Sequence, residues 1–248
     1  MEVHHHSHSE RKKWTHYLWE FLMLFLAVFC GFLAENLREH SIEQQREKKY
    51  IRSMIEDLKL DTTYFATETS GRSQNRKMVD TLIRLLSQKE RSEPEQQHMY
   101  YLARVCISKV ELPQINDRTY DQMKSSGNLR LIHKEDIADS ISQYYFNAKE
   151  IQVNINQTQL RILDAIDAEG KVFNGVVFQQ LMDMDNFVFR NPEGNPSLVT
   201  MDTEKINELI VKLHYLISIS AFTEKYFKKM NEQAGRLILF LQNEYHLK

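Results

Sequence analysis

The chain has few of the residues that interrupt helices. Its 248 residues include seven glycines and four prolines, and the first proline is Pro94. A proline inside a helix removes a hydrogen bond and clashes with the preceding turn, whereas sheet-rich domains and phosphate-binding loops need many turn residues. The shortage of both residues predicts an all-α fold with long helices.

Cysteine and unbalanced charge are also scarce. Cys30 lies in an apolar segment and Cys106 in a separate helical pattern, so no disulfide is expected between them. The 32 lysines and arginines stand against 34 acidic residues, which gives a formal net charge of -2. Because the basic residues are scattered along the chain, we predict no nucleic-acid partner.

Recognisable catalytic motifs are missing as well. The sequence contains no HExxH, no GxSxG, no P-loop and no glycine-rich dinucleotide loop. We therefore expect no catalysis, no cofactor and no metal site. The alternative that stays open is an enzyme whose site is assembled from scattered helical residues, with Asp183, Asp185 and His214 as the best candidates. Tightly bound stoichiometric metal in the purified protein would favour that alternative.

The histidines are interpreted in the same way. Four of them stand close together near the N-terminus: His4, His5, His6 and His8. Neighbouring imidazoles can share a transition-metal ion, but this run has no rigid scaffold, so we interpret it as part of a polar tail. His98 and His133 stand alone and are interpreted as surface or structurally satisfied side chains.

The longest apolar run is the residue stretch 21–34, which reads FLMLFLAVFCGFLA. As a helix it is about 21 Å long, and extending it back to Tyr17 gives about 27 Å, close to the hydrocarbon thickness of a bilayer. Trp14 and Trp19 supply interfacial aromatic residues, and Arg11 is the first of three basic residues outside them. We predict a polar His-rich tail at 1–13, a transmembrane helix at 14–35 and a soluble helical domain at 36–248.

Three other readings of the apolar run were weighed. A buried core helix of a soluble protein can have the same length. A cleaved signal peptide is disfavoured because Phe32, three residues before any cut after Ala34, is too large. A lipoprotein signal is disfavoured because Phe29, rather than a small residue, precedes Cys30. An uncleaved anchor is the best interpretation.

One face of the predicted anchor is distinctive. At about 100° per residue, Glu20, Ala27, Gly31 and Glu35 fall on the same side of the helix. Ala27 and Gly31 form a small-xxx-small pair, which lets two helices approach closely in lipid. We predict that this face associates with a second copy or with a partner membrane protein. The equally weighted alternative is that Glu20 reaches the headgroups and the small residues are coincidental.

Basic residues flank the anchor on both sides, with Arg11, Lys12 and Lys13 before it and Arg38, Arg46, Lys48 and Lys49 after it. This nearly balanced charge defines the orientation poorly. A short basic N-terminus before a first apolar helix usually stays inside, so we favour an extracytoplasmic position for the soluble domain.

The rest of the chain predicts a multi-helix bundle. Apolar residues recur at helical spacing over most of it. One or two helices are expected over 35–88, with a kink in the polar stretch 61–76. A loop is expected at 90–94, with Ser92 as a possible N-cap of a helix that runs to about Ser108. The other expected helices cover 118–126 (closed by Gly127), about 137–166, 171–185 and a final region from Thr200 or Asp202, with a break near 218–223; a loop is expected at 191–196.

The segment 120–145 also has the outline of a helix-turn-helix DNA reader. Its second helix would present Glu135, Asp136 and Asp139, which are too acidic to lie against phosphates. Tyr144 and Tyr145 are better interpreted as residues packed inside the bundle. A membrane-tethered DNA-binding protein therefore stays only as an alternative.

Two sequence blocks carry a family resemblance. The first is MEVHHHSHSERKKWTHYLWEFLMLFLAVFCGFLAENLREH followed by REKKYIRSMIEDLKLDT, and the second is TYDQMKSSGNLRLIHKEDIADSISQYY. In their order and spacing they resemble a family of uncharacterised single-pass membrane proteins of the Bacteroidota, although they cover under half of the chain. The resemblance implies membrane residence, a shared helical domain and a native His-rich start; it implies no activity, ligand or catalytic residue.

These observations predict a membrane-anchored helical interaction or sensing module without catalysis. Its partners would be the lipid bilayer and a second copy or another membrane protein. A binding event would pass along the long, proline-free helical run into the anchor.

Overall fold

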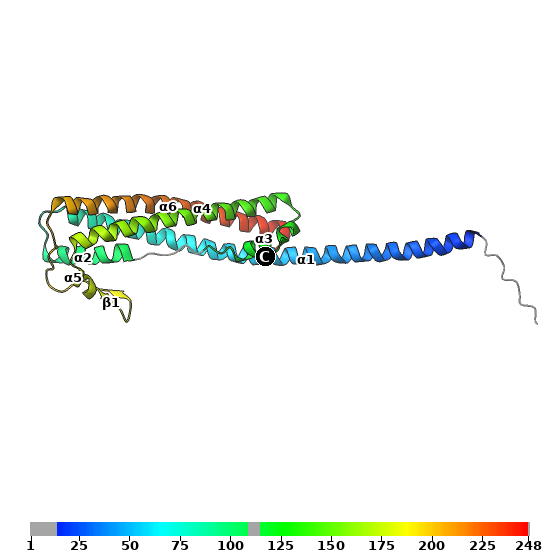
Figure 1. Ribbon diagram of the computed structural model, residues 1–248, viewed down its shortest axis with the longest axis horizontal. Helices are drawn as coiled ribbons and strands as arrows, with labels where there is room; N and C mark the ends of the chain where they lie inside the picture. Colours follow the sequence, from blue (N-terminus) through cyan, green and yellow to red (C-terminus); the bar gives the residue numbers. More distant parts are fainter. Residues whose placement is uncertain (1–13, 109–114, 248) are drawn as a thin grey trace, which may run out of the picture. The chain divides into compact units, whose positions relative to one another are not determined.

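The computed structural model describes residues 14–108 and 115–247, and helices account for most of them (Figure 1). Of the described residues, those at 14–50 form one unit, and those at 51–108 and 115–247 form another. The all-α prediction is confirmed. The elements in order are α1 (Trp14–Ser87), α2 (Glu93–Ser108), α3 (Arg118–Ser125), the 3-10 helix η1 (Asn128–Leu131), α4 (Glu135–Val172), α5 (Gly175–Gln180), β1 (Met182–Asp183), β2 (Val188–Phe189) and α6 (Thr203–Tyr245).

The polar stretch 61–76 is helical throughout, although a kink was expected there. Its threonines satisfy their hydroxyls locally, since Thr62 and Thr63 both donate to the Lys59 carbonyl, at 2.8 and 3.1 Å. Thr67 donates in the same way to the carbonyl of Thr63. Because the hydroxyls bond to the preceding turn and no proline intervenes, the helix continues through a sequence of modest helix propensity.

The start of α2 follows the predicted capping pattern. The Ser92 hydroxyl and its backbone N–H both donate to the Glu95 carboxylate at 2.9 Å, and Gln96 N–H donates to the Ser92 carbonyl at 2.9 Å. This arrangement satisfies groups that a helix start otherwise leaves unpaired. The end of α3 also agrees with the sequence: Gly127 has φ of 71°, a conformation that favours glycine.

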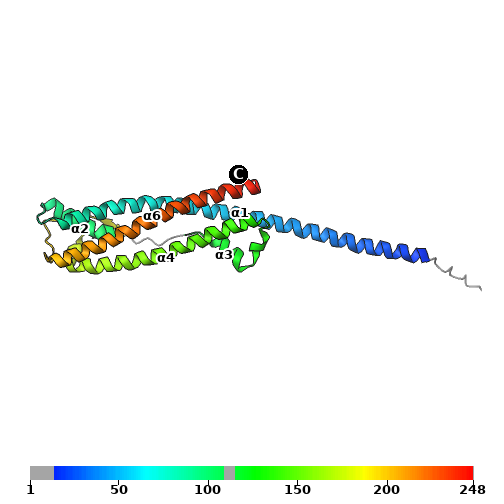
Figure 2. The ribbon, with the colours of Figure 1, turned by 90° about the horizontal axis from the view of Figure 1, so that it is seen from above.

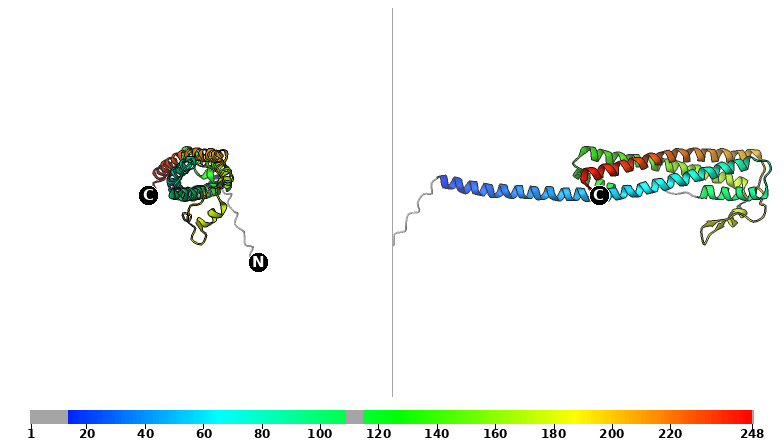
Figure 3. Two further views of the ribbon diagram at one scale, coloured as in Figure 1. Left: turned by 90° about the vertical axis from the view of Figure 1, so that its left-hand side faces the viewer. Right: turned by 180° about the vertical axis from the view of Figure 1, so that it is seen from behind.

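Within the unit that begins at Ile51, the long helices alternate in direction. Asn75 of α1 donates to the carbonyl of Cys106 in α2, while Asp61 accepts from Asn116, so α2 and then α3 run antiparallel to α1. Asp61 also accepts from Tyr144, near the start of α4. The helix α6 returns beside α4, as Figures 1 and 2 show. The result is an up-down-up-down bundle, whose clustered helices are seen end-on in Figure 3.

The helix predicted over 171–185 is confirmed only as the short α5, and its second half is wrong. The helix α4 ends at Val172, and after the short α5 the chain forms an antiparallel hairpin in which Met182 pairs with Phe189. The Asp183 carboxylate accepts from the backbone N–H groups of Asp185 and Asn186, at 3.1 and 3.2 Å. This Asx turn gives the backbone an alternative to the helical ladder, so the helix does not continue.

The predicted loop 191–196 and the Asp202 cap are confirmed. Asp202 accepts from Glu204 N–H at 2.9 Å at the start of α6. The expected break near 218–223 does not occur, since α6 is continuous from Thr203 to Tyr245. Ser218 and Thr223 donate their hydroxyls to carbonyls four residues earlier, within the helix.

Candidate functional site

The apolar part of α1 is exposed along its whole length. Every residue from Trp14 to His40 is exposed, and none of its most apolar 18-residue window is buried. Phe21, Phe25 and Phe29 stack along one side, with ring centroids 6.3 and 6.0 Å apart. By length and composition this helix could span a membrane. A core helix of a soluble protein would bury these side chains, whereas here they are exposed.

The structure places the four residues of the predicted association face on this exposed helix. The Glu20 carboxylate lies 3.1 Å from Nε2 of His16, one turn earlier, and Glu35 accepts from Arg38 at 2.9 Å. Gly31 has no described atom within 4 Å of where a Cβ would stand, and Ala27 lies at the edge of a shallow surface hollow. Both carboxylates are thus held at the ends of the apolar stretch, with small residues between them.

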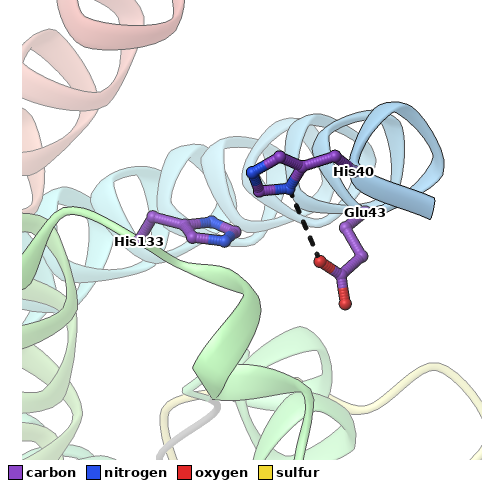
Figure 4. A group of neighbouring side chains, drawn as sticks. All are labelled: His40, Glu43 and His133. Atoms are coloured by element: carbon purple, nitrogen blue, oxygen red, sulfur yellow. Dashed lines mark ion pairs between the residues drawn. The ribbon is translucent and has the colours of Figure 1, made fainter. Parts of the chain in front are cut away.

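Two other polar residues of the same unit lie just after the apolar stretch. His40 and Glu43 lie one turn apart on α1, and their Nδ1 and Oε2 atoms are 3.9 Å apart (Figure 4). His133, also drawn in Figure 4, belongs to the other unit, in the segment before α4, and is exposed. His98 is exposed on α2 and stacks on Tyr101. The N-terminal histidines lie outside the described residues.

The three residues of the enzyme alternative do not form a common site. Asp183 and Asp185 lie in the hairpin turn, where Asp183 also accepts from Arg190 at 2.6 Å. Hydrogen bonds, first from the Asn186 side chain and then from backbone N–H groups, lower the pKa of Asp183. His214 is exposed on α6, and no hydrogen bond or ion pair joins it to either aspartate within 14–108 and 115–247.

Two buried carboxylates that the sequence analysis did not single out fix α3 and α4 on α1. Asp61 is fully buried and accepts three hydrogen bonds: from the Asn116 backbone and side chain, both at 2.8 Å, and from the Tyr144 hydroxyl at 2.6 Å. Asp57 accepts from Arg118 and from Thr119. Burial raises the pKa of Asp61, although its hydrogen bonds act in the opposite direction. The predicted burial of Tyr144 and Tyr145 is confirmed.

These carboxylates are fully occupied by protein groups, so they hold the fold rather than offer a binding site. Tyr145 stacks on Tyr120 with centroids 4.3 Å apart and meets Tyr144 edge-on at 5.1 Å. Burial is the main reason that the pKa values of Tyr144 and Tyr145 are raised. Asp57, Asp61 and the two tyrosines thus form a buried, hydrogen-bonded part of the core.

A cavity of about 130 Å³ lies further along the bundle, among α1, α2, α4 and α6. Its polar lining residues are Glu68, Arg72, Gln74, Asn75, Thr158 and Ser220. The remaining lining residues are Gly71, Met78, Cys106, Ile162 and Leu216. Gly71 and Gln74 are exposed, so the cavity opens to solvent beside them, whereas Glu68, Thr158 and Ser220 are buried.

Arg72 is the central charged group of this cavity. Its side chain is 15% exposed, its Nη2 lies 3.4 Å from Glu68 Oε2, and its guanidinium lies 5.1 Å from the centroid of the Phe227 ring. Burial lowers the pKa of Arg72, but an arginine stays charged at neutral pH. The carboxylate and the aromatic face offset part of the cost of burying this charge.

Two polar atoms of residues that line the cavity, Arg72 Nε and Asn75 Oδ1, have almost no accessible surface and no hydrogen-bond partner among the described residues. The Asn75 amide nitrogen donates to the Cys106 carbonyl at 3.2 Å, which fixes the side chain. Buried polar groups in folded proteins nearly always have partners, and each exception needs an explanation such as a bound molecule.

The sequence contains a signal for this cavity in the spacing of polar residues along α1. Glu68, Arg72 and Asn75 continue the helical spacing of the buried residues Phe65 and Val79, so they take core-facing positions of α1. Polar residues at core positions mark either a buried network or a binding site.

Comparison with protein-family models, with curated proteins and with solved structures finds no match to this chain.

Proposed function

We propose that this protein is a membrane-anchored sensing module that binds a small polar molecule inside its helical bundle. The observation that carries the proposal is the cavity, which opens to solvent and is lined by the charged side chains of Glu68 and Arg72 together with the buried Thr158 and Ser220. A hydrogen bond to a charged group contributes about 1.5–3 kcal/mol. Such groups around a solvent-accessible space give the cavity an affinity for polar ligands.

The exposed apolar part of α1 supports the anchoring half of the proposal. A continuous exposed apolar surface of this kind is rare on monomeric soluble proteins and is typical of membrane or protein contacts. We propose that residues 14–35 cross a bacterial inner membrane once and that the bundle lies on the periplasmic side. A reporter enzyme fused to the C-terminus tests the orientation: activity of a reporter that works only in the cytoplasm would contradict it.

The small-residue face supports self-association of the anchor. Ala27 and Gly31 leave room for a second helix, while the Phe21–Phe25–Phe29 stack lies on another side and would face lipid. Disulfide crosslinking of cysteines introduced one at a time along 20–35 tests this. Crosslinks should concentrate at the positions of the small face, and crosslinks spread evenly around the helix would contradict the proposal.

Signal transmission would use α1, because this one helix carries both Arg72 and the apolar segment. A ligand that changes the pairing of Arg72 acts directly on the helix that enters the membrane. Hydrogen exchange over residues 36–50 tests the idea, since rapid exchange there would mean that this part of the helix is too flexible to transmit strain.

Ligand binding can be tested with the full chain in detergent. We would measure thermal unfolding with small amino acids, carboxylates, amines and amides. A probe at 100 times its dissociation constant stabilises the folded state by about 2.7 kcal/mol, which raises the midpoint by about 5–11 °C for a protein of this size.

Gly71→Leu supplies the specificity control. A Cβ at Gly71 meets no atom within 4 Å, so leucine fits the helix and fills the space beside the cavity opening. Gly170→Leu, at an exposed helical glycine that does not line the cavity, is the matched variant. We expect a binding probe to raise the unfolding midpoint of the wild type and of Gly170→Leu but not that of Gly71→Leu. If the probes stabilise all three proteins equally, or none of them, a ligand site in this cavity is contradicted.

A further inference from the structure

We infer that the ligand of this cavity is a small zwitterion, such as an α-amino acid with a short side chain. The inference rests on the proposed ligand-binding role and names the chemical class that the site fits. The charge balance of the lining, its donors and acceptors and the size of the cavity support it.

The charge balance favours a ligand without net charge. Glu68 and Arg72 are the only charged residues among those that line the cavity, and their charges cancel. The nearby Arg76 is already paired with Glu224 on α6. A free anion would be attracted by Arg72 but repelled by Glu68. A free cation would be attracted by Glu68 but repelled by Arg72. A molecule that carries one charge of each sign can satisfy both.

The available donors and acceptors match the two ends of a zwitterion. The Arg72 guanidinium and the Ser220 hydroxyl are donors on residues that line the cavity, so a carboxylate has partners there. The Glu68 carboxylate is an acceptor, which suits an ammonium group with its three N–H donors. An acid without the amine would not pair with Glu68, and an amine without the acid would not pair with Arg72.

The size and the remaining lining set the side chain of the ligand. An empty protein cavity of about 150 Å³ accommodates benzene, with its six heavy atoms. The cavity here, at about 130 Å³, therefore has room for about as many heavy atoms as alanine contains. Met78, Ile162 and Leu216 supply an apolar wall, which suits a methyl group.

Isothermal titration calorimetry of the full chain in detergent tests the inference with three probes: L-alanine, propionate and ethylamine. The last two each keep one charged end of alanine. We expect alanine to bind at least tenfold more tightly than either, because each loses one charge-assisted set of hydrogen bonds. If propionate or ethylamine binds as tightly as alanine, the zwitterion inference fails while the ligand site stands. If none of the three binds, and the wider probe panel gives no stabilisation, the proposed function fails with it.

A charge-changing variant gives a second readout. Glu68→Gln keeps the shape of the side chain but leaves the cavity with a net positive charge, so the preference should move from alanine towards propionate by about tenfold or more. Glu232→Gln is the matched control, because Glu232 also precedes an arginine by four residues but is exposed on α6 and does not line the cavity. The control should keep the wild-type order of affinities. An unchanged order in Glu68→Gln would overturn the assignment of the ammonium end to Glu68.

Discussion

Replacing Asp61 by alanine should destabilise the bundle strongly. Asp61 is fully buried, and its carboxylate accepts three hydrogen bonds, two from Asn116 and one from Tyr144. Alanine leaves three buried donors without a partner, at about 1–3 kcal/mol each, although a water molecule in the vacated space can recover part of this. We expect a loss of about 3–5 kcal/mol in the free energy of unfolding.

Asp61→Asn should be much milder. The asparagine keeps an oxygen that accepts from both donors of Asn116, and its amide can donate to the hydroxyl oxygen of Tyr144. Urea unfolding of the full chain in detergent measures both variants, and Asp80→Ala, at an exposed position of α1, is the control. The control should stay within about 0.5 kcal/mol of the wild type. An Asp61→Ala variant as stable as the control would refute the assignment of this carboxylate as a structural lock.

The wild type and Asp61→Asn should also differ in how their stability depends on pH. Burial, the largest influence, raises the pKa of Asp61 in the folded state above its unfolded value, so the folded state binds the proton more tightly. Between the unfolded and the folded pKa the wild type should lose stability as pH rises, because the folded chain retains a proton that the unfolded chain releases. Asp61→Asn cannot release this proton, and its stability should lack that component. An identical pH dependence in both proteins would contradict the raised pKa.

Three further predictions concern single residues. Burial raises the pKa of the Cys106 thiol to about 12. In a Cys30→Ser background, alkylation of Cys106 at pH 8 should therefore be about a thousandfold slower in the folded protein than in the protein unfolded in urea. Equal rates would contradict its burial. Gly127→Ala, at φ of 71°, should lower the free energy of unfolding in urea by about 1 kcal/mol, whereas Gly170→Ala in α4 should raise it by about as much. A stabilising Gly127→Ala would contradict the helix end described. Gly31→Ile should weaken association of the full chain in detergent, measured by analytical ultracentrifugation, and unchanged association would argue against the small-residue face.

The long helices could be predicted because their apolar residues recur at a spacing that only a helix places on one face. Ile137, Ile141 and Ile151 of α4 are all buried, as their spacing requires. Caps at Ser92 and Asp202 were equally visible, because a capping side chain acts on residues only two or three positions away. Features that depend on neighbouring residues in the chain are thus readable from the sequence.

The hairpin at 182–189 and the cavity depend on more distant or more finely balanced contacts. The residues of the hairpin fit a helical pattern, and the outcome is decided by the bonds of the Asp183 carboxylate to the next turn. For the cavity, α1 shows polar residues at core positions, but Thr158 and Ser220 come from α4 and α6. Their proximity follows from the bundle topology, which the pattern of a single helix does not contain.

The most direct test of a ligand site inside the bundle is methyl NMR of the full chain labelled at methionine. Met78 lines the cavity, whereas the buried Met54 lies 24 residues earlier on the same helix, about 36 Å away along its axis. The account predicts that at least one of the small probes, L-alanine first among them, shifts the Met78 methyl signal saturably and leaves the Met54 signal unmoved. A Met78 signal that stays fixed at saturating concentrations of every probe, or equal shifts at both residues, would contradict a binding site in this cavity.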